Sequence, residues 1–305
     1  MKKYDVLIIG GGGAGLTAAL YTSRAKLSTL LLEKLVPGGQ IALTDTVENY
    51  PGFPEGITGP EISQRMEDQA KRYGTEVVYQ EVKSIAKVNG EFQIKSAEGS
   101  YQGRSVILAA GASFRMLGIP GERELTGKGV SYCATCDGAF FKEKEIVVVG
   151  GGDSALQEGL FLTRFATKIS VVHRRDTLRA SPILQERAKN HPKINFIWDT
   201  VVEKVKGDRK VEGVTLKNLK TQQVRDFRTD GFFVFIGHDP NTSFLKSFVE
   251  LDEKGYIQAD PFTRTSIPGV FAAGEIRAGA VKQLVAACGE GCEAALAAQE
   301  YLDHL

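Results

Sequence analysis

Residues 5–16 read DVLIIGGGGAGL, and this stretch decides the fold of the first half of the chain. An apolar segment leads into a glycine turn in which Gly10, Gly12 and Gly15 stand at the spacing G-x-G-x-x-G. The first glycine allows a tight turn, the second lets the backbone approach a pyrophosphate, and the third lets helix and strand pack closely. Glu33 ends the next apolar segment. A carboxylate there accepts hydrogen bonds from ribose hydroxyls and repels a 2′-phosphate, which predicts an unphosphorylated adenosine, as in FAD or NAD.

The same pattern recurs near the middle of the chain. The apolar segment 146–149 leads into Gly150-x-Gly152-x-x-Ala155, and the following apolar segment ends at His173, where the first copy has Glu33. Each copy predicts a strand, a helix and a second strand, and continuous apolar strands suit a parallel sheet covered on both faces. The sequence therefore predicts an α/β protein with two Rossmann-like dinucleotide-binding domains.

Basic residues follow the second strand of this second copy. Arg174 and Arg175 come directly after His173, and Arg179 follows four residues later. A solvated basic turn would have the same composition, but guanidinium groups match phosphate oxygens, and the position at this strand end favours the 2′-phosphate of NADP. The predicted NADPH site comprises Gly150, Gly152, Asp153, Ser154, Ala155, His173, Arg174, Arg175 and Arg179.

Composition and charge limit the kinds of protein that this chain can be. The chain has 305 residues, of which 42% are hydrophobic, and this fits about two globular domains. A net charge of +1 gives no bulk attraction for nucleic acid or an anionic membrane. No apolar stretch is long enough to span a bilayer, and the glycines at 10–13 would break a signal-peptide helix. We expect a cytoplasmic protein with catalytic or free cysteines and no metal.

The cysteines form two pairs. Cys133 and Cys136 precede the second glycine turn, and four interpretations compete: a zinc site completed by Cys288 and Cys292, a thioredoxin-like motif, ordinary core cysteines, or a redox disulfide beside a flavin. In the last, Asp137 would donate a proton to a departing thiolate; otherwise it is a cap or turn residue. Cys288 and Cys292 share a helix face, which favours packing over a second redox pair.

The chain also resembles the low-molecular-weight thioredoxin reductases of bacteria and archaea over essentially its whole length. The motifs that carry this resemblance are CATCDG at 133–138, GGQ at 38–40, VENYPG at 47–52, HRR at 173–175, IGHDPNT at 236–242 and VFAAG at 270–274. The resemblance implies a homodimeric flavoprotein in which NADPH reduces FAD, FAD reduces a Cys133–Cys136 disulfide, and this pair reduces a thioredoxin or thioredoxin-like protein. Cys136 would face the flavin and Cys133 would attack the partner's disulfide.

The resemblance further implies a discontinuous FAD-binding domain, residues 1–114 and 245–305. The NADPH-binding domain, residues 115–244, would be inserted between these segments and carry the redox pair. The expected FAD site comprises Gly10, Gly12, Gly15, Glu33, Gly39, Gln40, Asn49, Gly111, Gly274, Glu275, Lys282 and Gln283. The chain departs from the family pattern at Glu275, where Asp is common, at Lys282, where Arg is common, and across 275–281.

Two other functions fit the same sites. A flavin-dependent dithiol oxidase would hand its electrons to oxygen and release hydrogen peroxide without a protein partner. A non-enzymatic flavin redox sensor would use the same cofactor sites for signalling.

Overall fold

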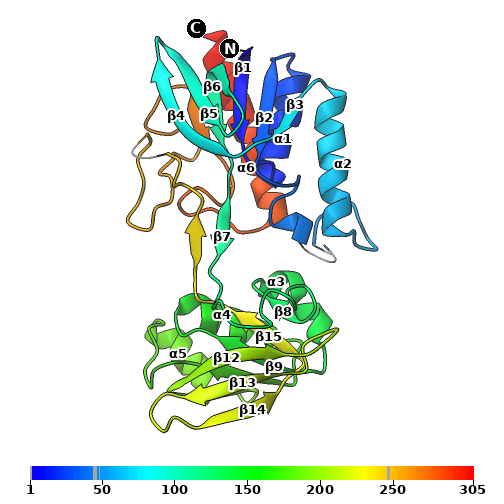
Figure 1. The fold of residues 1–305 in the computed structure, drawn as a ribbon, viewed down its shortest axis with the longest axis vertical. Coiled ribbons are helices and arrows are strands. Elements are labelled where there is room, and N and C mark those ends of the chain that lie inside the picture. The colour runs from blue at the N-terminus through cyan, green and yellow to red at the C-terminus, as the bar shows by residue number, and fades with distance from the viewer. Residues whose placement is uncertain (1, 44–46, 48, 246–247) are drawn as a thin grey trace. The chain divides into compact units, whose positions relative to one another are not determined.

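The computed structural model describes residues 2–43, 47, 49–245 and 248–305, so Glu48 of the VENYPG motif lies outside the described residues. The chain divides into two compact units (Figure 1). Unit 1 comprises Met1–Ser113 and Asp239–Leu305, and unit 2 comprises Phe114–His238. We describe each unit by itself.

Unit 1 is built on a sheet with the order β3-β2-β1-β6-β5-β4, in which β17 also pairs with β6. The parallel strands are β1 (Lys2–Ile9), β2 (Thr29–Glu33), β3 (Glu76–Tyr79), β6 (Ser100–Leu108) and β17 (Val270–Ala272). The strands β4 (Val82–Val88) and β5 (Glu91–Ser96) extend it in antiparallel fashion. The helices are α1 (Gly13–Arg24), η1 (Ile41–Leu43), α2 (Gly59–Arg72) and α6 (Leu284–Asp303).

Unit 2 contains a parallel sheet with the order β11-β10-β9-β15-β8. Its strands are β8 (Val130–Ser131), β9 (Glu145–Val149), β10 (Lys168–Val172), β11 (Ile194–Ile197) and β15 (Gly231–Val234). An antiparallel sheet of β12 (Thr200–Lys206), β13 (Gly213–Asn218) and β14 (Val224–Arg228) accompanies it. The helices are α3 (Ala134–Asp137), η2 (Gly138–Phe141), α4 (Asp153–Leu162) and α5 (Pro182–Lys189).

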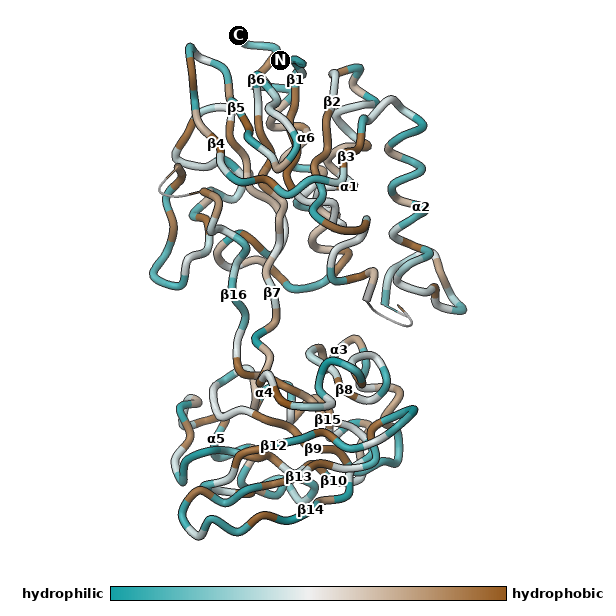
Figure 2. The backbone as a smooth tube through the Cα atoms, in the orientation of Figure 1, coloured by the Kyte–Doolittle hydropathy of each residue, from teal (hydrophilic) through white to brown (hydrophobic). Residues whose placement is uncertain are grey.

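The two parallel sheets repeat one topology, because β3-β2-β1-β6 in unit 1 corresponds to β11-β10-β9-β15 in unit 2. Alternate residues of the first strand enter different cores: Val6 and Ile8 pack on one face of the sheet, and Leu7 and Ile9 on the other. Figure 2 shows hydrophobic residues concentrated along the central strands of each unit. Burial on both faces explains the continuous apolar segments, and the prediction of two Rossmann-like units is confirmed.

Small residues let α6 pack tightly against α1 in unit 1. A Cβ added to Gly291 on α6 would lie 2.1 Å from the carbonyl oxygen of Ala14 on α1, which no real side chain tolerates. The alanine-rich sequence of α6 therefore reflects close contact between the two helices, and this contact brings the carboxyl-terminal segment to the first glycine turn.

The chain crosses between the units at 113/114 and at 238/239, where β7 (Ala112–Phe114) pairs with β16 (His238–Pro240). The sequence places the second boundary at 244/245, whereas the structure groups 239–244 with unit 1. The side chain of Asn241 donates to the carbonyl oxygen of Ala110 at 2.8 Å, and its backbone N–H donates to that of Gly111 at 3.0 Å. These bonds tie the segment to unit 1. None of the helices in the described ranges has the length and apolar character needed to cross a membrane.

Candidate redox and dinucleotide sites

The first glycine turn joins β1 to α1 and leaves no space for side chains at two positions. Gly10 has φ +106°, and a Cβ there would lie 2.3 Å from the carbonyl oxygen of Ala109. A Cβ on Gly15 would lie 1.8 Å from the carbonyl oxygen of Gly10. Gly12 differs, because a Cβ there would meet only the carbonyl oxygen of Gly38, at 3.9 Å. The turn is therefore packed on its inner side and open at Gly12, the residue that precedes α1.

Glu33 closes this turn from the end of β2. One carboxylate oxygen accepts a hydrogen bond from the N–H of Gly11 at 2.7 Å, and the other accepts one from the N–H of Leu35 at 2.9 Å. The following loop also lies on the turn, since the N–H of Gly38 donates to the carbonyl oxygen of Gly11 at 2.7 Å. A Cβ on Gly39 would lie 3.7 Å from the Cα of Gly12. The structure thus assembles the predicted residues of segments 10–15 and 33–40.

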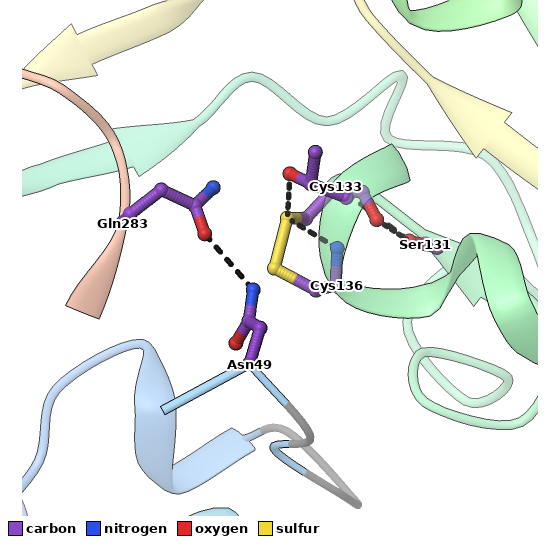
Figure 3. The surroundings of a disulfide bond; sticks show 6 residues. Asn49, Ser131, Cys133, Cys136 and Gln283 are labelled. Atoms are coloured by element: carbon purple, nitrogen blue, oxygen red, sulfur yellow. Dashed lines mark hydrogen bonds between the residues drawn. A yellow bond between two sulfur atoms is a disulfide. The ribbon is translucent and has the colours of Figure 1, made fainter. Parts of the chain in front are cut away.

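Hydrogen bonds connect several of the remaining predicted flavin residues to distant segments of unit 1. Asn49 donates to the side-chain oxygen of Gln283 at 3.0 Å (Figure 3). Gln40 donates to the carbonyl oxygen of Ala112, immediately after Gly111, which has φ +66°. These contacts bring together segments that lie far apart in the sequence.

The carboxylate of Glu275 stands out because of its surroundings. Its Oε2 atom is buried, and no group among the described residues makes a hydrogen bond with it. Burial raises the pKa of Glu275, while the charge of Lys282 and a hydrogen bond from Gln40 oppose this rise. A buried, unsatisfied acceptor is costly in free energy, about 1–3 kcal/mol. It suits a ligand that brings hydroxyl donors, such as the ribityl chain or ribose of FAD.

Sequence reasoning missed an ion pair that supports Gly274 and Glu275. Glu290 on α6 accepts a hydrogen bond from the N–H of Gly274 at 2.7 Å and pairs with Arg277 at 2.8 Å. Arg277 also donates to the carbonyl oxygen of Asp260 at 3.1 Å. Both charged side chains are largely buried, at 15% and 13% exposure. The only signal in the sequence is one charged residue within the small-residue run AACGEG.

The substitution Glu275→Gln tests whether this carboxylate is kept for a ligand. Because its folded-state pKa is raised above the unfolded value, its contribution to stability is fully present at low pH and is lost as pH rises through the folded pKa. Glu275→Gln is therefore expected to raise the Tm of FAD-free protein at pH 7 by about 2–4 °C, with a smaller gain at pH 4. We also expect it to weaken FAD binding in a fluorescence titration.

The matched control for this substitution is Glu293→Gln, which removes the same charge from an exposed position on α6. It should leave both the Tm and the FAD affinity unchanged. An equal change in Tm at pH 4 and pH 7, together with unaltered FAD binding by Glu275→Gln, would contradict a ligand-directed role for this carboxylate.

The second glycine turn, between β9 and α4, is built in the same way. A Cβ on Gly150 would lie 2.5 Å from the carbonyl oxygen of Phe235 and 2.5 Å from the Cβ of Ala155, which is itself fully buried. Gly152 has nothing within 4 Å of its added Cβ. Asp153 and Ser154 are exposed in the first turn of α4, and Asp153 accepts a hydrogen bond from the N–H of Ser181 at 2.6 Å.

His173 takes the place that Glu33 has in unit 1. Its ring is buried under the second turn, where a Cβ on Gly151 would lie 2.2 Å from ring atom Cε1. Ring atom Nε2 forms a hydrogen bond with the carbonyl oxygen of Thr177 at 3.0 Å. Burial lowers the pKa of His173, which favours the neutral ring. The side chain therefore supports the turn from within.

The three arginines are exposed around this turn. Arg174 and Arg175 follow His173, the first residue after β10. Arg179 is held by its backbone, whose N–H donates to the carbonyl oxygen of Gly151 at 2.7 Å. The loop that covers the second turn thus carries three arginines. The corresponding loop of unit 1 instead follows the carboxylate of Glu33 at the end of β2.

Cys133 and Cys136 form a disulfide at the start of α3 in unit 2 (Figure 3). The N–H of Cys136 donates to the sulfur of Cys133 at 3.2 Å, and the hydroxyl of Thr135 lies 3.6 Å from the same sulfur. The Ser131 hydroxyl accepts from the N–H of Cys133 at 3.1 Å and lies 3.2 Å from its carbonyl oxygen. Asp137, half-buried, ends α3. Of the four interpretations, the structure shows the disulfide.

Cys288 and Cys292 are both free thiols on α6. Cys288 is buried, and this burial raises the pKa of its thiol. A buried thiol with a raised pKa stays protonated and is a poor nucleophile, because the reactive form is the thiolate. Packing against α1 accounts for Cys288, as the helical spacing suggested.

Comparison with known proteins agrees with this geometry. Residues 4–291 match the family model described as pyridine nucleotide-disulphide oxidoreductase. A thioredoxin reductase of Bacillus subtilis (strain 168) is 49% identical over 305 residues, covering 100% of this chain and 96% of that protein. The crystal structure of thioredoxin reductase from Streptococcus pyogenes MGAS5005 is 44% identical, with a TM-score of 0.95 and 99% of each chain covered. The chain therefore belongs to the pyridine nucleotide-disulphide oxidoreductase family, and within it to the low-molecular-weight thioredoxin reductases that its motifs indicated.

Proposed function

We propose that this protein is a thioredoxin-disulfide reductase that transfers electrons from NADPH through FAD to the Cys133–Cys136 disulfide, and from there to a thioredoxin-like protein. The observation that carries this proposal is the disulfide itself, which lies in a unit that also contains a dinucleotide turn. Membership of the family implies the use of a flavin and a pyridine nucleotide.

Unit 1 has the features that FAD requires. Among the glycines of the turn at Gly10–Gly15, only Gly12 is open. Glu33 places a carboxylate where it would repel the 2′-phosphate of NADP. Glu275 has a buried oxygen that lacks a donor among the described residues. When bound, FAD supplies the two-electron carrier between nicotinamide and disulfide. The proposed FAD residues are Gly10, Gly12, Gly15, Glu33, Gly39, Gln40, Asn49, Gly111, Gly274, Glu275, Lys282 and Gln283.

Unit 2 has the features that NADPH requires. Its turn is open at Gly152, and the exposed guanidinium groups of Arg174, Arg175 and Arg179 offer bidentate partners for a 2′-phosphate. His173 would contribute by holding the turn in place. The proposed residues that complete this site are Gly150, Asp153, Ser154 and Ala155.

The chemistry of the cysteine pair follows from its surroundings. Two electrons and two protons convert the disulfide into two thiols. The Cys133 thiolate, which the Cys136 N–H stabilises, attacks one sulfur of the partner's disulfide. This breaks the partner's S–S bond, forms a mixed disulfide and releases the partner's other sulfur as the first thiolate. The Cys136 thiolate then attacks the sulfur of Cys133, which releases the second partner thiolate and restores the internal disulfide. We assign to Asp137 the proton that the departing thiolate takes up.

The decisive experiment is anaerobic NADPH consumption by the FAD-loaded protein, with a thioredoxin from the same source as the sole acceptor. Stoichiometric formation of thioredoxin thiols supports the proposal. Oxidation of an added dithiol that needs air, requires neither NADPH nor thioredoxin and yields hydrogen peroxide would support the dithiol oxidase instead, and an absence of turnover in both assays would favour a redox sensor.

We also propose that the protein is a homodimer, as the resemblance implies, and that it acts in the cytoplasm, as expected from its sequence. Light scattering coupled to gel filtration measures the assembly directly. A mass near twice 33.1 kDa would support the dimer, whereas a mass near 33.1 kDa would refute it.

A further inference from the structure

Tyr132, the residue before Cys133, lies within an aromatic group in unit 2. Its ring stacks on that of Phe114, with centroids 5.1 Å apart and planes inclined by 18°. The ring of Phe114 also contacts that of His238, at 4.9 Å. Phe114 ends β7 and His238 begins β16, so these two rings mark where the chain enters and leaves unit 2.

The hydroxyl of Tyr132 donates to the carboxylate of Glu122 at 3.1 Å. Glu122 is completely buried and also accepts backbone hydrogen bonds from Leu117 at 3.0 Å, Gly118 at 2.8 Å and Ile119 at 3.4 Å. These donors fix the backbone just after the first crossing. Burial, followed by the charge of Glu122, raises the pKa of Tyr132, so the phenol stays protonated and continues to donate.

The backbone of Tyr132 leads directly into the redox pair. Ser131 is buried in β8 and hydrogen-bonds with the backbone of Cys133 on the far side of Tyr132. Cys133 in turn receives the N–H of Cys136 on its sulfur. The backbone of Tyr132 is therefore continuous with the segment that aligns this hydrogen bond.

Simple packing does not explain the choice of residues. A completely buried carboxylate costs several kcal/mol of desolvation unless its donors are complete, and an apolar side chain of similar volume would fill the space at lower cost. Glu122 and Tyr132 together instead give a directional link between the segment at 117–119 and the residue before Cys133.

We propose that Tyr132 is a positioning residue for the redox pair, which couples Cys133 to both crossing segments through the carboxylate of Glu122 and the rings of Phe114 and His238. The inference rests on the proposed function, in that Cys133 is the thiol that exchanges with the partner. Loosening Tyr132 then weakens the hydrogen bond from Cys136 to the Cys133 sulfur and raises the pKa of the reduced Cys133 thiol.

The test is the pH dependence of iodoacetamide alkylation at Cys133 in the full, dithiol-reduced holoenzyme, followed by mass spectrometry of the peptide. Tyr132→Phe keeps the stacked ring and loses the bond to Glu122, whereas Tyr132→Leu loses both. We expect the alkylation midpoint to rise in the order wild type, Phe, Leu. At pH 7 the alkylation rate of Tyr132→Leu should fall about 3- to 10-fold, as a shift of about half to one pH unit requires.

The matched control is Phe196→Leu, which removes a ring stacked on Trp198 at 4.8 Å elsewhere in unit 2. It should lower the Tm of the protein and leave the alkylation profile unchanged. If Tyr132→Leu lowers the Tm equally but keeps the wild-type profile, Tyr132 only packs and the proposal is overturned. If Tyr132→Leu does not fold, Tyr132→Phe serves as the test. A wild-type pH profile of Cys133 alkylation in Tyr132→Phe would refute the link through Glu122.

The alkylation experiment needs neither NADPH nor a thioredoxin, so it separates this inference from the proposed function. A wild-type protein that cannot reduce thioredoxin refutes the function and leaves the alkylation profile as it is. A wild-type protein that reduces thioredoxin, combined with a profile indifferent to Tyr132, refutes only the positioning role.

Discussion

Replacing Cys136 with serine is expected to lower thioredoxin reduction by at least about 1,000-fold, because a residue that forms a covalent intermediate acts as a unit with its partner. The variant cannot form the internal disulfide, so no electrons reach an external acceptor through the pair. The measurement is anaerobic NADPH consumption with thioredoxin, together with non-reducing electrophoresis. Cys136→Ser should trap a mixed disulfide between Cys133 and an oxidised thioredoxin, since the resolving thiol is missing.

Two further variants make this result specific. Cys133→Ser should be equally inactive but should form no mixed disulfide, if Cys133 is the attacking thiol. Cys292→Ser removes a free thiol from α6 and should retain wild-type turnover. A trapped complex with Cys133→Ser and none with Cys136→Ser would reverse the assignment of the two sulfurs, and wild-type turnover by Cys136→Ser would refute the relay.

The second large effect is expected from Arg174→Ala combined with Arg175→Ala. Loss of two exposed guanidinium groups should raise the KM for NADPH by about 10- to 100-fold, because a charge-assisted hydrogen bond contributes about 1.5–3 kcal/mol and solvent screening reduces it. The KM for NADH should barely change, since NADH has no 2′-phosphate. The measurement is steady-state reduction of an artificial dye with each nucleotide, which does not require the cysteine pair.

The control removes the same charge from the same unit. Arg225→Ala combined with Arg228→Ala changes two exposed arginines of β14. The preference for NADPH over NADH should then stay at the wild-type value. Equal losses with both nucleotides in Arg174→Ala/Arg175→Ala would show that these arginines support the fold of the loop rather than select the phosphate.

The glycine turns and the repeated fold were predictable because their constraints are local. Gly15 is required by its contact with Gly10 in the same turn, and Gly10 by its φ of +106°, and the spacing records both requirements. The positions of Gln40 and Gln283 came from the resemblance, since their partners lie in distant segments.

Side-chain direction and burial of charge were not predictable in the same way. The ring of His173 packs beneath Gly151, whereas its place in the sequence indicated only the end of a strand. The buried pairs of Glu290 with Arg277 and of Glu122 with Tyr132 look, in the sequence, like ordinary solvated residues. Their roles depend on which atoms the folded backbone brings within about 3 Å of each other. The spacing of residues along the sequence does not reveal such contacts between distant segments.

The division of the chain into an interrupted unit and a continuous one fixes an order of events during synthesis. Unit 2 is a single stretch, Phe114–His238, and every strand of its sheets has left the ribosome before β17 and α6 of unit 1 exist. Until residues 270–303 emerge, unit 1 lacks β17, which pairs with β6, and α6, which packs on α1. The unit whose synthesis begins first is therefore the unit that is completed last, and the apolar face that α6 covers in the folded protein stays open until then.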